Sequence, residues 1–182
     1  MSQEQHAADV SPALVVMVGP PGTGKSHLVR ELALRVPVSI VQTDAVRRTI
    51  VSRPEYTSEE NRRVFSVAHR RTEWLLRQGH NVVFDATNIY EWGRRVLYRI
   101  ADRAGARLLI VRTVAPDDVI ERRLRGRVAG LDPNDQSEAG WEVYARMKAA
   151  FERIERPHLI VDTSLDLEPA LQEIVRFIRG QK

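Results

Sequence analysis

Short apolar runs alternate with longer segments of mixed polarity along this chain. The apolar runs cover residues 14–18, 38–42, 82–85, 107–114 and 159–162. Each has the usual length of a strand, and the segments between them are long enough for helices. This alternation is typical of βαβ units. The pattern therefore predicts an α/β fold with a parallel sheet.

The segments of mixed polarity predict the helices. Thr57-Ser-Glu-Glu60 reads as a capping box that opens a long helix, and Gly79 ends it. Phe65, Ala68, Thr72 and Leu75 recur at spacings of three and four and form its inward face. Further helices are expected over residues 26–35, 44–52, 91–104, 116–125, 137–153 and 168–179. Trp74, Trp92, Trp141 and Tyr144 are expected to be packing residues and not a base-stacking platform, which is the alternative.

Length and composition limit the kinds of protein that this chain can be. We find no interdomain linker in the 182 residues, so residues 13–182 are expected to form one domain after a mobile tail at 1–12. The chain has no cysteine, which excludes disulfides and thiolate metal sites. No apolar run approaches the roughly 20 residues of a membrane span, and the first residues do not resemble a signal peptide. We expect a cytoplasmic protein with no membrane contact and no obligate protein partner.

The net charge of +4 comes mostly from arginine. A mild positive excess is compatible with a nucleic-acid partner and equally with arginines that face a nucleotide. The five histidines are scattered without metal-ligand spacing.

A complete phosphate-binding motif follows the first apolar run. Residues 19–26 read Gly-Pro-Pro-Gly-Thr-Gly-Lys-Ser, with a predicted strand before and a predicted helix after. Glycines let successive amides point at one anion, and the helix N-terminus adds positive potential. Lys25 is expected to reach the β- and γ-phosphates and Ser26 to hold Mg²⁺. The predicted ATP-binding residues are Gly19, Pro20, Pro21, Gly22, Thr23, Gly24, Lys25, Ser26 and His27.

Polar residues stand where the predicted strands end. Gly19, Asp44, Asp85 and Thr163 each lie at or just after the carboxyl end of a strand. In open α/β sheets the ligand crevice lies outside those ends, so these residues are expected to meet at one site.

Asp44 and Arg47 follow the second strand, in Thr-Asp-Ala-Val-Arg. A carboxylate there can accept the proton of an attacking hydroxyl. The alternative is that Asp44 only caps the next helix. Arg47 can bind a phosphate of the acceptor, while Arg48 is expected to be solvated.

Asp85 closes the third strand, an arrangement that positions Mg²⁺ in P-loop enzymes. Thr87 and Asn88 follow at once and are candidates for orienting Asp85 or touching the acceptor. The alternative for Asn88 is that it only shapes the turn.

Four arginines crowd residues 122–127, ahead of a segment rich in Gly, Pro, Asn and Asp. A solvated helix face is the ordinary explanation. A lid over about residues 123–138 could instead close over ATP, with Arg123 and Arg127, four residues apart, facing the transferred phosphoryl group.

With these motifs in view, the chain resembles the P-loop kinases of the polynucleotide kinase and zeta-toxin-like group. The elements are the loop at 19–26, Asp44 with Arg47, Asp85-Ala-Thr-Asn88, and residues 119–127. The resemblance implies a three-layer P-loop NTPase sandwich, with a five-stranded parallel sheet in the order 2-3-1-4-5 and an arginine-bearing lid. It also implies that Asp44 activates the acceptor hydroxyl and that Arg47 holds an acceptor phosphate.

The sequence thus predicts an ATP- and Mg²⁺-dependent kinase with a hydroxyl acceptor, first of all a polynucleotide 5′-hydroxyl. A kinase for a metabolite, nucleoside, antibiotic or nucleotide-sugar is the close alternative. A regulatory ATPase is a third hypothesis, and the pairing of Asp44 with Arg47 argues against it.

Overall fold

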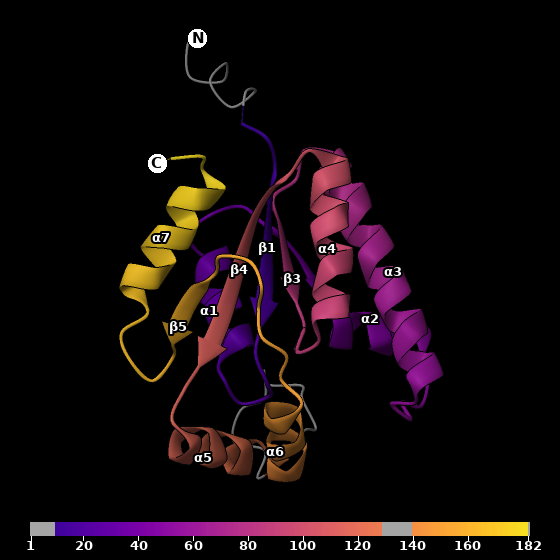
Figure 1. Ribbon diagram of the computed structural model, residues 1–182, viewed down its shortest axis with the longest axis vertical. Helices are drawn as coiled ribbons and strands as arrows, with labels where there is room; N and C mark the ends of the chain where they lie inside the picture. Colours follow the sequence, from indigo (N-terminus) through magenta and orange to yellow (C-terminus); the bar gives the residue numbers. More distant parts are fainter. Residues whose placement is uncertain (1–9, 129–139, 182) are drawn as a thin grey trace.

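The computed structural model describes residues 10–128 and 140–181, with only the backbone at residues 127 and 128. Five strands form one parallel sheet, and helices lie on both of its faces (Figure 1). The strands are β1 (Ala13–Val18), β2 (Ser39–Gln42), β3 (Val82–Asp85), β4 (Arg107–Val114) and β5 (Leu159–Asp162). All five agree with the predicted strands to within one residue.

The helices are α1 (Lys25–Ala33), α2 (Thr43–Ile50), α3 (Ser58–Arg77), α4 (Glu91–Ala104), α5 (Asp117–Val128), α6 (Trp141–Ala149) and α7 (Glu168–Ile178). Helix α3 begins at the predicted residue, and the Thr57 side chain accepts a hydrogen bond from the Glu60 amide as in a capping box. The Glu60 carboxylate, however, accepts from the Glu55 amide at 2.7 Å, so only half of the predicted box forms. Within the described parts of the chain, no helix has the length and apolar character needed to cross a bilayer.

The strand order is β2-β3-β1-β4-β5, which confirms the predicted topology. Strand β1 lies at the centre, pairing with β3 on one side and with β4 on the other. The carboxyl ends of all five strands therefore lie at one edge of the sheet, the lower edge in Figure 1.

Alternate residues of β1 supply the two halves of the core. Leu14, Val16 and Val18 pack under α3 and α4, whereas Ala13, Val15 and Met17 face α1 and α7. All six side chains are fully buried, as expected for the central strand of a sheet covered on both faces. Two packed layers of helices thus hold the strand that leads into the phosphate-binding motif.

Helix α6 ends earlier than the sequence predicts. It stops at Ala149 and not at Arg153, and the predicted start at residues 137–139 lies outside the described residues. The Glu152 amide donates to the Ile89 carbonyl oxygen at 3.0 Å, so this stretch bonds to the start of α4 and not to its own helix. A tertiary contact overrides the helical pattern there.

The prediction that these four aromatic residues are packing residues holds for Tyr144 and for Trp141, whose ring centroids lie 5.0 Å apart, but the tryptophans do not lie in the core. Trp74, Trp92 and Trp141 are 60%, 66% and 40% exposed, and only Tyr144 is buried.

Candidate phosphate-transfer site

The phosphate-binding loop runs from β1 into α1 at the carboxyl edge of the sheet (Figure 1). Gly24 is the N-cap of α1 and has a φ of 85°, a conformation that favours glycine. A Cβ at Gly24 would lie 2.7 Å from the Thr163 hydroxyl oxygen. At Gly22, with a φ of 82°, a Cβ would lie 2.7 Å from a methyl of Ile120. Both the backbone conformation and the surrounding packing therefore require glycine.

Threonines from two neighbouring strands hold the loop in place. The Thr23 and Thr113 hydroxyl oxygens lie 2.8 Å apart, and the Thr163 hydroxyl donates to the Thr23 carbonyl oxygen at 2.9 Å. The Gly19 amide donates to the Thr87 carbonyl oxygen at 2.9 Å. Thr163, which sequence analysis placed at the ligand edge, thus contacts the loop directly. Thr113 was not predicted, because nothing in its local sequence sets it apart from a core strand.

Lys25 and Ser26 occupy the first turn of α1. The Lys25 ammonium donates to the Pro20 carbonyl oxygen at 2.9 Å, so the side chain folds back over the loop. The Ser26 hydroxyl donates to Asp85 Oδ2 at 3.0 Å. His27, the next residue, is exposed.

Asp85 ends β3 and is 4% exposed. Besides Ser26, its Oδ2 accepts from the Gln42 side-chain amide at 3.4 Å. A serine hydroxyl and a carboxylate are the hard oxygen ligands that Mg²⁺ prefers, together with phosphate oxygens and water. The pair therefore fits the predicted Mg²⁺ site. No group of three His, Asp or Glu residues is gathered anywhere in the described chain, so an all-protein metal cage is not formed there.

Asp44 lies in the first turn of α2 and is partly exposed. The N-cap of α2 is Gln42, so the alternative in which Asp44 is only a cap is wrong. Gln42 stands opposite Asp85 in the sheet register. Asp44 therefore follows β2 at the same edge where Ser26 and Asp85 meet. Among the described residues, no hydrogen bond or ion pair engages its carboxylate.

Arg47 points into the protein and is 5% exposed. Its guanidinium is ion-paired with Glu60, donates to the Asn61 side-chain oxygen at 2.6 Å, and lies 4.5 Å from the centre of the Tyr56 ring. The structure thus ties Arg47 to the start of α3. This engagement was not visible in sequence, because Glu60 and Asn61 read there as ordinary first-turn residues.

Thr87 and Asn88 continue from β3 past the site. Asn88 adopts a φ of 47°, is 6% exposed, and donates its side-chain amide to the Met17 carbonyl oxygen at 2.7 Å. Its side chain therefore anchors the turn to β1, as the turn-shaping alternative predicted.

Arg123, on α5, reaches the far side of the phosphate-binding loop. Its guanidinium donates to the Thr163 hydroxyl at 2.8 Å, to the Thr163 carbonyl oxygen at 2.8 Å, and to the Gly22 carbonyl oxygen at 3.3 Å. Arg122 and Arg125 instead form exposed pairs with carboxylates on their own helix. The Arg127 side chain and most of the expected lid, residues 129–138, lie outside the described residues.

Arg94 is a residue that sequence analysis missed. It is fully buried on α4, and its guanidinium donates to Glu91 Oε2 at 2.7 Å and to the Asn88 carbonyl oxygen at 2.7 Å. It also donates to the carbonyl oxygens of Glu152 and Arg153, each at 2.8 Å. Arg94 therefore joins the turn after β3 to the segment after α6. The only sequence signal was its place on the buried stripe of a helix, which an arginine does not normally occupy.

His69 lies on α3 beside the strand that carries Asp85. Its ring stacks on Phe84 at 5.5 Å between centroids and packs near Phe65 at 5.8 Å. Burial lowers the pKa of His69 to about 4, so the ring is neutral at physiological pH.

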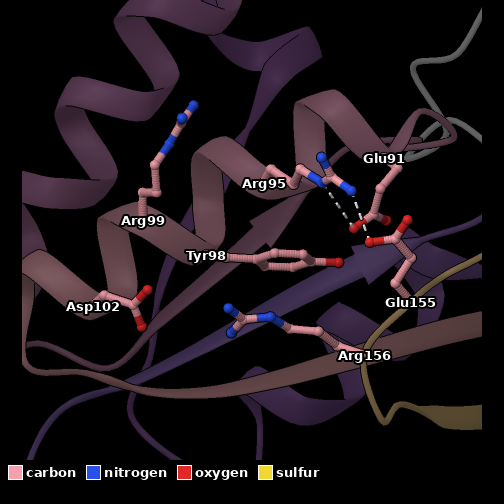
Figure 2. Close-up of a pocket in the computed structure, with 7 residues that line it drawn as sticks. All are labelled: Glu91, Arg95, Tyr98, Arg99, Asp102, Glu155 and Arg156. Atoms are coloured by element: carbon pink, nitrogen blue, oxygen red, sulfur yellow. Dashed lines mark hydrogen bonds and ion pairs between the residues drawn. The ribbon is translucent and has the colours of Figure 1, made fainter.

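A separate hollow of about 330 Å³ lies between α4 and the segment before β5, and Figure 2 shows the side chains around it. Arg95 pairs with Glu155, and Arg156 lies 4.5 Å from the centre of the Tyr98 ring. The lining residues are Glu91, Arg95, Tyr98, Arg99, Asp102, Glu155 and Arg156. The lining residues include three arginines and three carboxylates, so the hollow does not have the positive excess of a phosphate site.

Comparison with known proteins matches the sequence to the family AAA_33, described as an AAA domain, over residues 14–154. Uncharacterised proteins of Mycobacterium bovis and Mycobacterium tuberculosis are 30% identical to it over 161 residues. The match covers 80% of this chain and 30% of each relative. The chain therefore spans about a third of the length of these curated relatives.

Two solved structures illustrate the likeness in fold. The APS kinase CysC of Mycobacterium tuberculosis, solved with AMPPNP and APS, has a TM-score of 0.69 at 16% identity, covering 91% of this chain and 96% of that one. A gluconokinase of Sinorhizobium meliloti has a TM-score of 0.66 at 18% identity, covering 94% of this chain and 96% of that one.

Proposed function

Because this chain belongs to the AAA_33 family, a family of P-loop kinases, we propose that it is an ATP-dependent kinase that phosphorylates an alcohol hydroxyl. One observation carries the proposal. The Ser26 hydroxyl bonds to Asp85, Asp85 accepts from Gln42, and Asp44 follows Gln42 by two residues. These contacts support a site in which the phosphate-binding loop and Asp44, whose carboxylate has no partner among the described residues, share one edge of the sheet.

The donor side is built from the phosphate-binding loop and the N-terminus of α1. Backbone amides and the helix dipole favour an anion at this end of α1, and Lys25 adds a full positive charge. Ser26 and Asp85 would hold Mg²⁺, which neutralises phosphate charge when it is bound. In this proposal Lys25 leaves the Pro20 carbonyl oxygen when a phosphate oxygen replaces it.

Asp44 is the proposed general base on the acceptor side. The acceptor hydroxyl oxygen forms a bond to the γ-phosphorus, and the bond between that phosphorus and the bridging oxygen of ADP breaks. The hydroxyl proton passes to the Asp44 carboxylate, and ADP leaves with the electron pair.

Arg123 is proposed to act on the donor side. Its contacts with Gly22 and Thr163 place the guanidinium against the loop, where a positive charge stabilises bound triphosphate. The role of Arg127 in neutralising the transferred group stays a prediction.

The state of Arg47 bears on the acceptor. As an ion pair with Glu60 inside the protein, Arg47 is not presented to an acceptor phosphate. This favours an acceptor that needs no phosphate of its own, and hence a small molecule. The gluconokinase of similar fold is named for such an acceptor.

A 5′-hydroxyl nucleic acid remains the second candidate. It is favoured by the net charge of +4, which comes from an excess of arginine over acidic residues. Because contacts to several backbone phosphates weaken steeply with salt, transfer to an oligonucleotide should depend on salt far more than transfer to a neutral metabolite.

The test is transfer of label from ATP carrying a radioactive γ-phosphate. The acceptor panel contains sugars, polyols, nucleosides and 5′-hydroxyl oligonucleotides, each assayed at two salt concentrations. Label on at least one acceptor, in a reaction that needs Mg²⁺ and is lost in Lys25→Met, supports the proposal. Release of inorganic phosphate with no labelled acceptor, at a rate that the panel does not change, would instead support the regulatory ATPase.

A further inference from the structure

Helix α2 carries the proposed base and a buried arginine on one of its faces. Asp44 and Arg47 are three residues apart, so their side chains are neighbours on the surface of α2. Asp44 is partly exposed, whereas Arg47, one turn further along, is 5% exposed. An acceptor whose hydroxyl reaches Asp44 therefore has the surroundings of Arg47 as the next part of that face.

Residues at the start of α3 close around Arg47, where α2 lies against α3 (Figure 1). One terminal nitrogen of the guanidinium is ion-paired with Glu60, and the other donates to the Asn61 side-chain oxygen at 2.6 Å. The Tyr56 ring lies over the guanidinium, with its centre 4.5 Å from the central carbon. The remaining nitrogen, Nε, is buried and has no hydrogen-bond partner in the described parts of the chain. The protein itself thus uses both terminal nitrogens of Arg47.

Glu60 is held in place by more than this ion pair. Its second carboxylate oxygen accepts from the Glu55 amide at 2.7 Å. The Asn61 side-chain amide donates to the Tyr56 carbonyl oxygen at 3.1 Å, which ties the same segment to α3. The hydrogen bond from the Glu55 amide, and after it the bond from Arg47, lower the pKa of the Glu60 carboxyl, so the group is ionised at neutral pH. Glu60 is therefore a fixed negative charge beside Arg47.

We propose that Glu60 is a specificity-determining residue: it cancels the charge of Arg47 and so restricts the acceptor to uncharged alcohols. This inference rests on the proposed kinase function and names the class of acceptor. A phosphate or carboxylate near Arg47 would meet the Glu60 carboxylate, and like charges placed side by side cost several kcal/mol. A cationic acceptor gains nothing from Glu60 either, because both of its oxygens already accept from the protein.

The alternative is that Arg47 binds an acceptor phosphate, as the resemblance to P-loop kinases implies. The phosphate would then have to displace Glu60 from a pair in which the two side chains are 6% and 10% exposed. Separating such a buried pair leaves an uncompensated charge, and binding of the phosphate would have to offset that cost. The contacts of Glu60 therefore favour exclusion of anionic acceptors over their capture.

The first experiment compares acceptors that differ only in charge. Each neutral acceptor that the wild-type protein labels is assayed beside its own monophosphate, with glucose and glucose 6-phosphate, and thymidine and thymidine 3′-monophosphate, among the pairs. The wild-type kcat/KM should be about tenfold or more higher for the neutral member. A higher kcat/KM for the phosphorylated member would overturn the proposal. This comparison needs no variant, so it decides the question even if a substitution at Glu60 prevents folding.

The second experiment removes the charge of Glu60. Glu60→Gln keeps the size of the side chain and an oxygen that can accept from the Glu55 amide. The ratio of kcat/KM between the neutral and the phosphorylated acceptor should fall about tenfold or more, mainly through a lower KM for the phosphorylated one. Glu59→Gln is the matched control, because Glu59 is exposed in the same first turn of α3, and its ratio should equal that of the wild type. An unchanged ratio in Glu60→Gln would overturn the proposal.

The third experiment measures anion binding without transfer, with sulfate as the probe. AMPPNP and Mg²⁺ are present to fill the phosphate-binding loop. Sulfate should raise the Tm of Glu60→Gln more than that of the wild type, because a ligand that binds the folded state stabilises it. The double variant Glu60→Gln/Arg47→Met should lose this extra shift. Equal shifts in all three proteins would overturn the role of Glu60.

The outcomes distinguish this proposal from the kinase function on which it rests. Sulfate binding that depends on Arg47 in Glu60→Gln, with no transfer to any acceptor, would overturn the kinase and leave Glu60 as the residue that cancels the charge of Arg47. Transfer by the wild type with a preference for phosphorylated acceptors would leave the kinase and overturn the role of Glu60.

Discussion

The donor and acceptor sides of the site differ in how they are built. On the proposed donor side, residues 19–26 supply most of the candidate ligands, and Asp85 and Arg123 join them from β3 and α5. Thr113 and Thr163 hydrogen-bond to Thr23 of the loop. On the proposed acceptor side, Asp44 and Asn88 come from separate segments, and Arg47 is held inside the protein by Glu60. We therefore expect ATP binding to depend mainly on one motif, and the choice of acceptor to depend on contacts between separate segments.

This difference has a physical origin. Phosphate is bound mainly by backbone amides, and a backbone path is fixed by glycines at defined positions. An acceptor is recognised by side chains, whose directions depend on the packing beneath them. The four predictions below test this contrast, in decreasing order of expected effect.

The turn after β3, which Arg94 anchors, should be the place where a substitution lowers the stability most. Arg94→Met is expected to lower the free energy of unfolding by about 3–5 kcal/mol, because it removes a buried cation and leaves three carbonyl oxygens without their donor. The neighbouring Arg95→Met should cost less than about 1 kcal/mol, since Arg95 is an exposed ion-pair residue. Urea unfolding of both variants measures the difference, and equal losses would remove Arg94 from its role as support.

Burial of His69 makes the free energy of unfolding sensitive to acid. Its pKa is about 4 in the folded protein, below the ordinary value of 6.5, so the unfolded chain binds the proton more readily. The contribution of His69 to the free energy of unfolding is therefore fully present above pH 6.5 and is lost as the pH falls through about 4, by about 3 kcal/mol in total. Thermal unfolding at a series of pH values should show a flatter profile for His69→Phe than for wild type. The exposed His80→Phe control should retain the wild-type slope, and an unchanged slope in His69→Phe would contradict the assignment.

Asp44→Asn tests the acceptor chemistry itself. Loss of a general base is expected to reduce transfer about a hundredfold, equivalent to about 2.7 kcal/mol, with ATP affinity unchanged. Asp102→Asn, an exposed carboxylate in the last turn of α4, serves as the control. Near-normal turnover of correctly folded Asp44→Asn would exclude Asp44 as the base.

Two glycines with nearly the same backbone conformation test the donor side. Gly24 has a φ of 85° and a crowded Cβ position, whereas Gly79 has a φ of 82° with no atom within 4 Å. Alanine at either position costs about 1–2 kcal/mol of backbone strain. Only Gly24→Ala should also weaken ATP binding, by about tenfold or more, and calorimetric titration with an ATP analogue would show this. Equal affinities in the two variants would mean that packing around the loop does not fix its path.

Much of the fold and of the donor site follows from local sequence. The strands were predictable because apolar runs are contiguous signals, and the strand order was implied by the resemblance to P-loop kinases that the motif at residues 19–26 helps to carry. The ion pair of Arg47 with Glu60 and the burial of Arg94 were not predictable. Each depends on partners outside its own helix, and no local sequence pattern identifies them. The exposure of Trp92 was not predictable either. Helical spacing places Trp92 in a helix but does not show which side of that helix other elements leave uncovered.

The end of α6 was mispredicted for a related reason. Residues 150–153 have helical character, but bonds to Ile89 and Arg94 hold them in another conformation. Pairing with a distant segment overrides local propensity when that segment offers fixed donors and acceptors.

The most direct test of the central claim is a crystal structure with Mg²⁺ and an unhydrolysable ATP analogue. The account predicts the β- and γ-phosphates against the amides of residues 19–26, Mg²⁺ on Ser26 and Asp85, and the Asp44 carboxylate facing the γ-phosphate across a gap that admits a hydroxyl. A nucleotide bound elsewhere, or an Asp44 side chain turned away from the γ-phosphate, would contradict it.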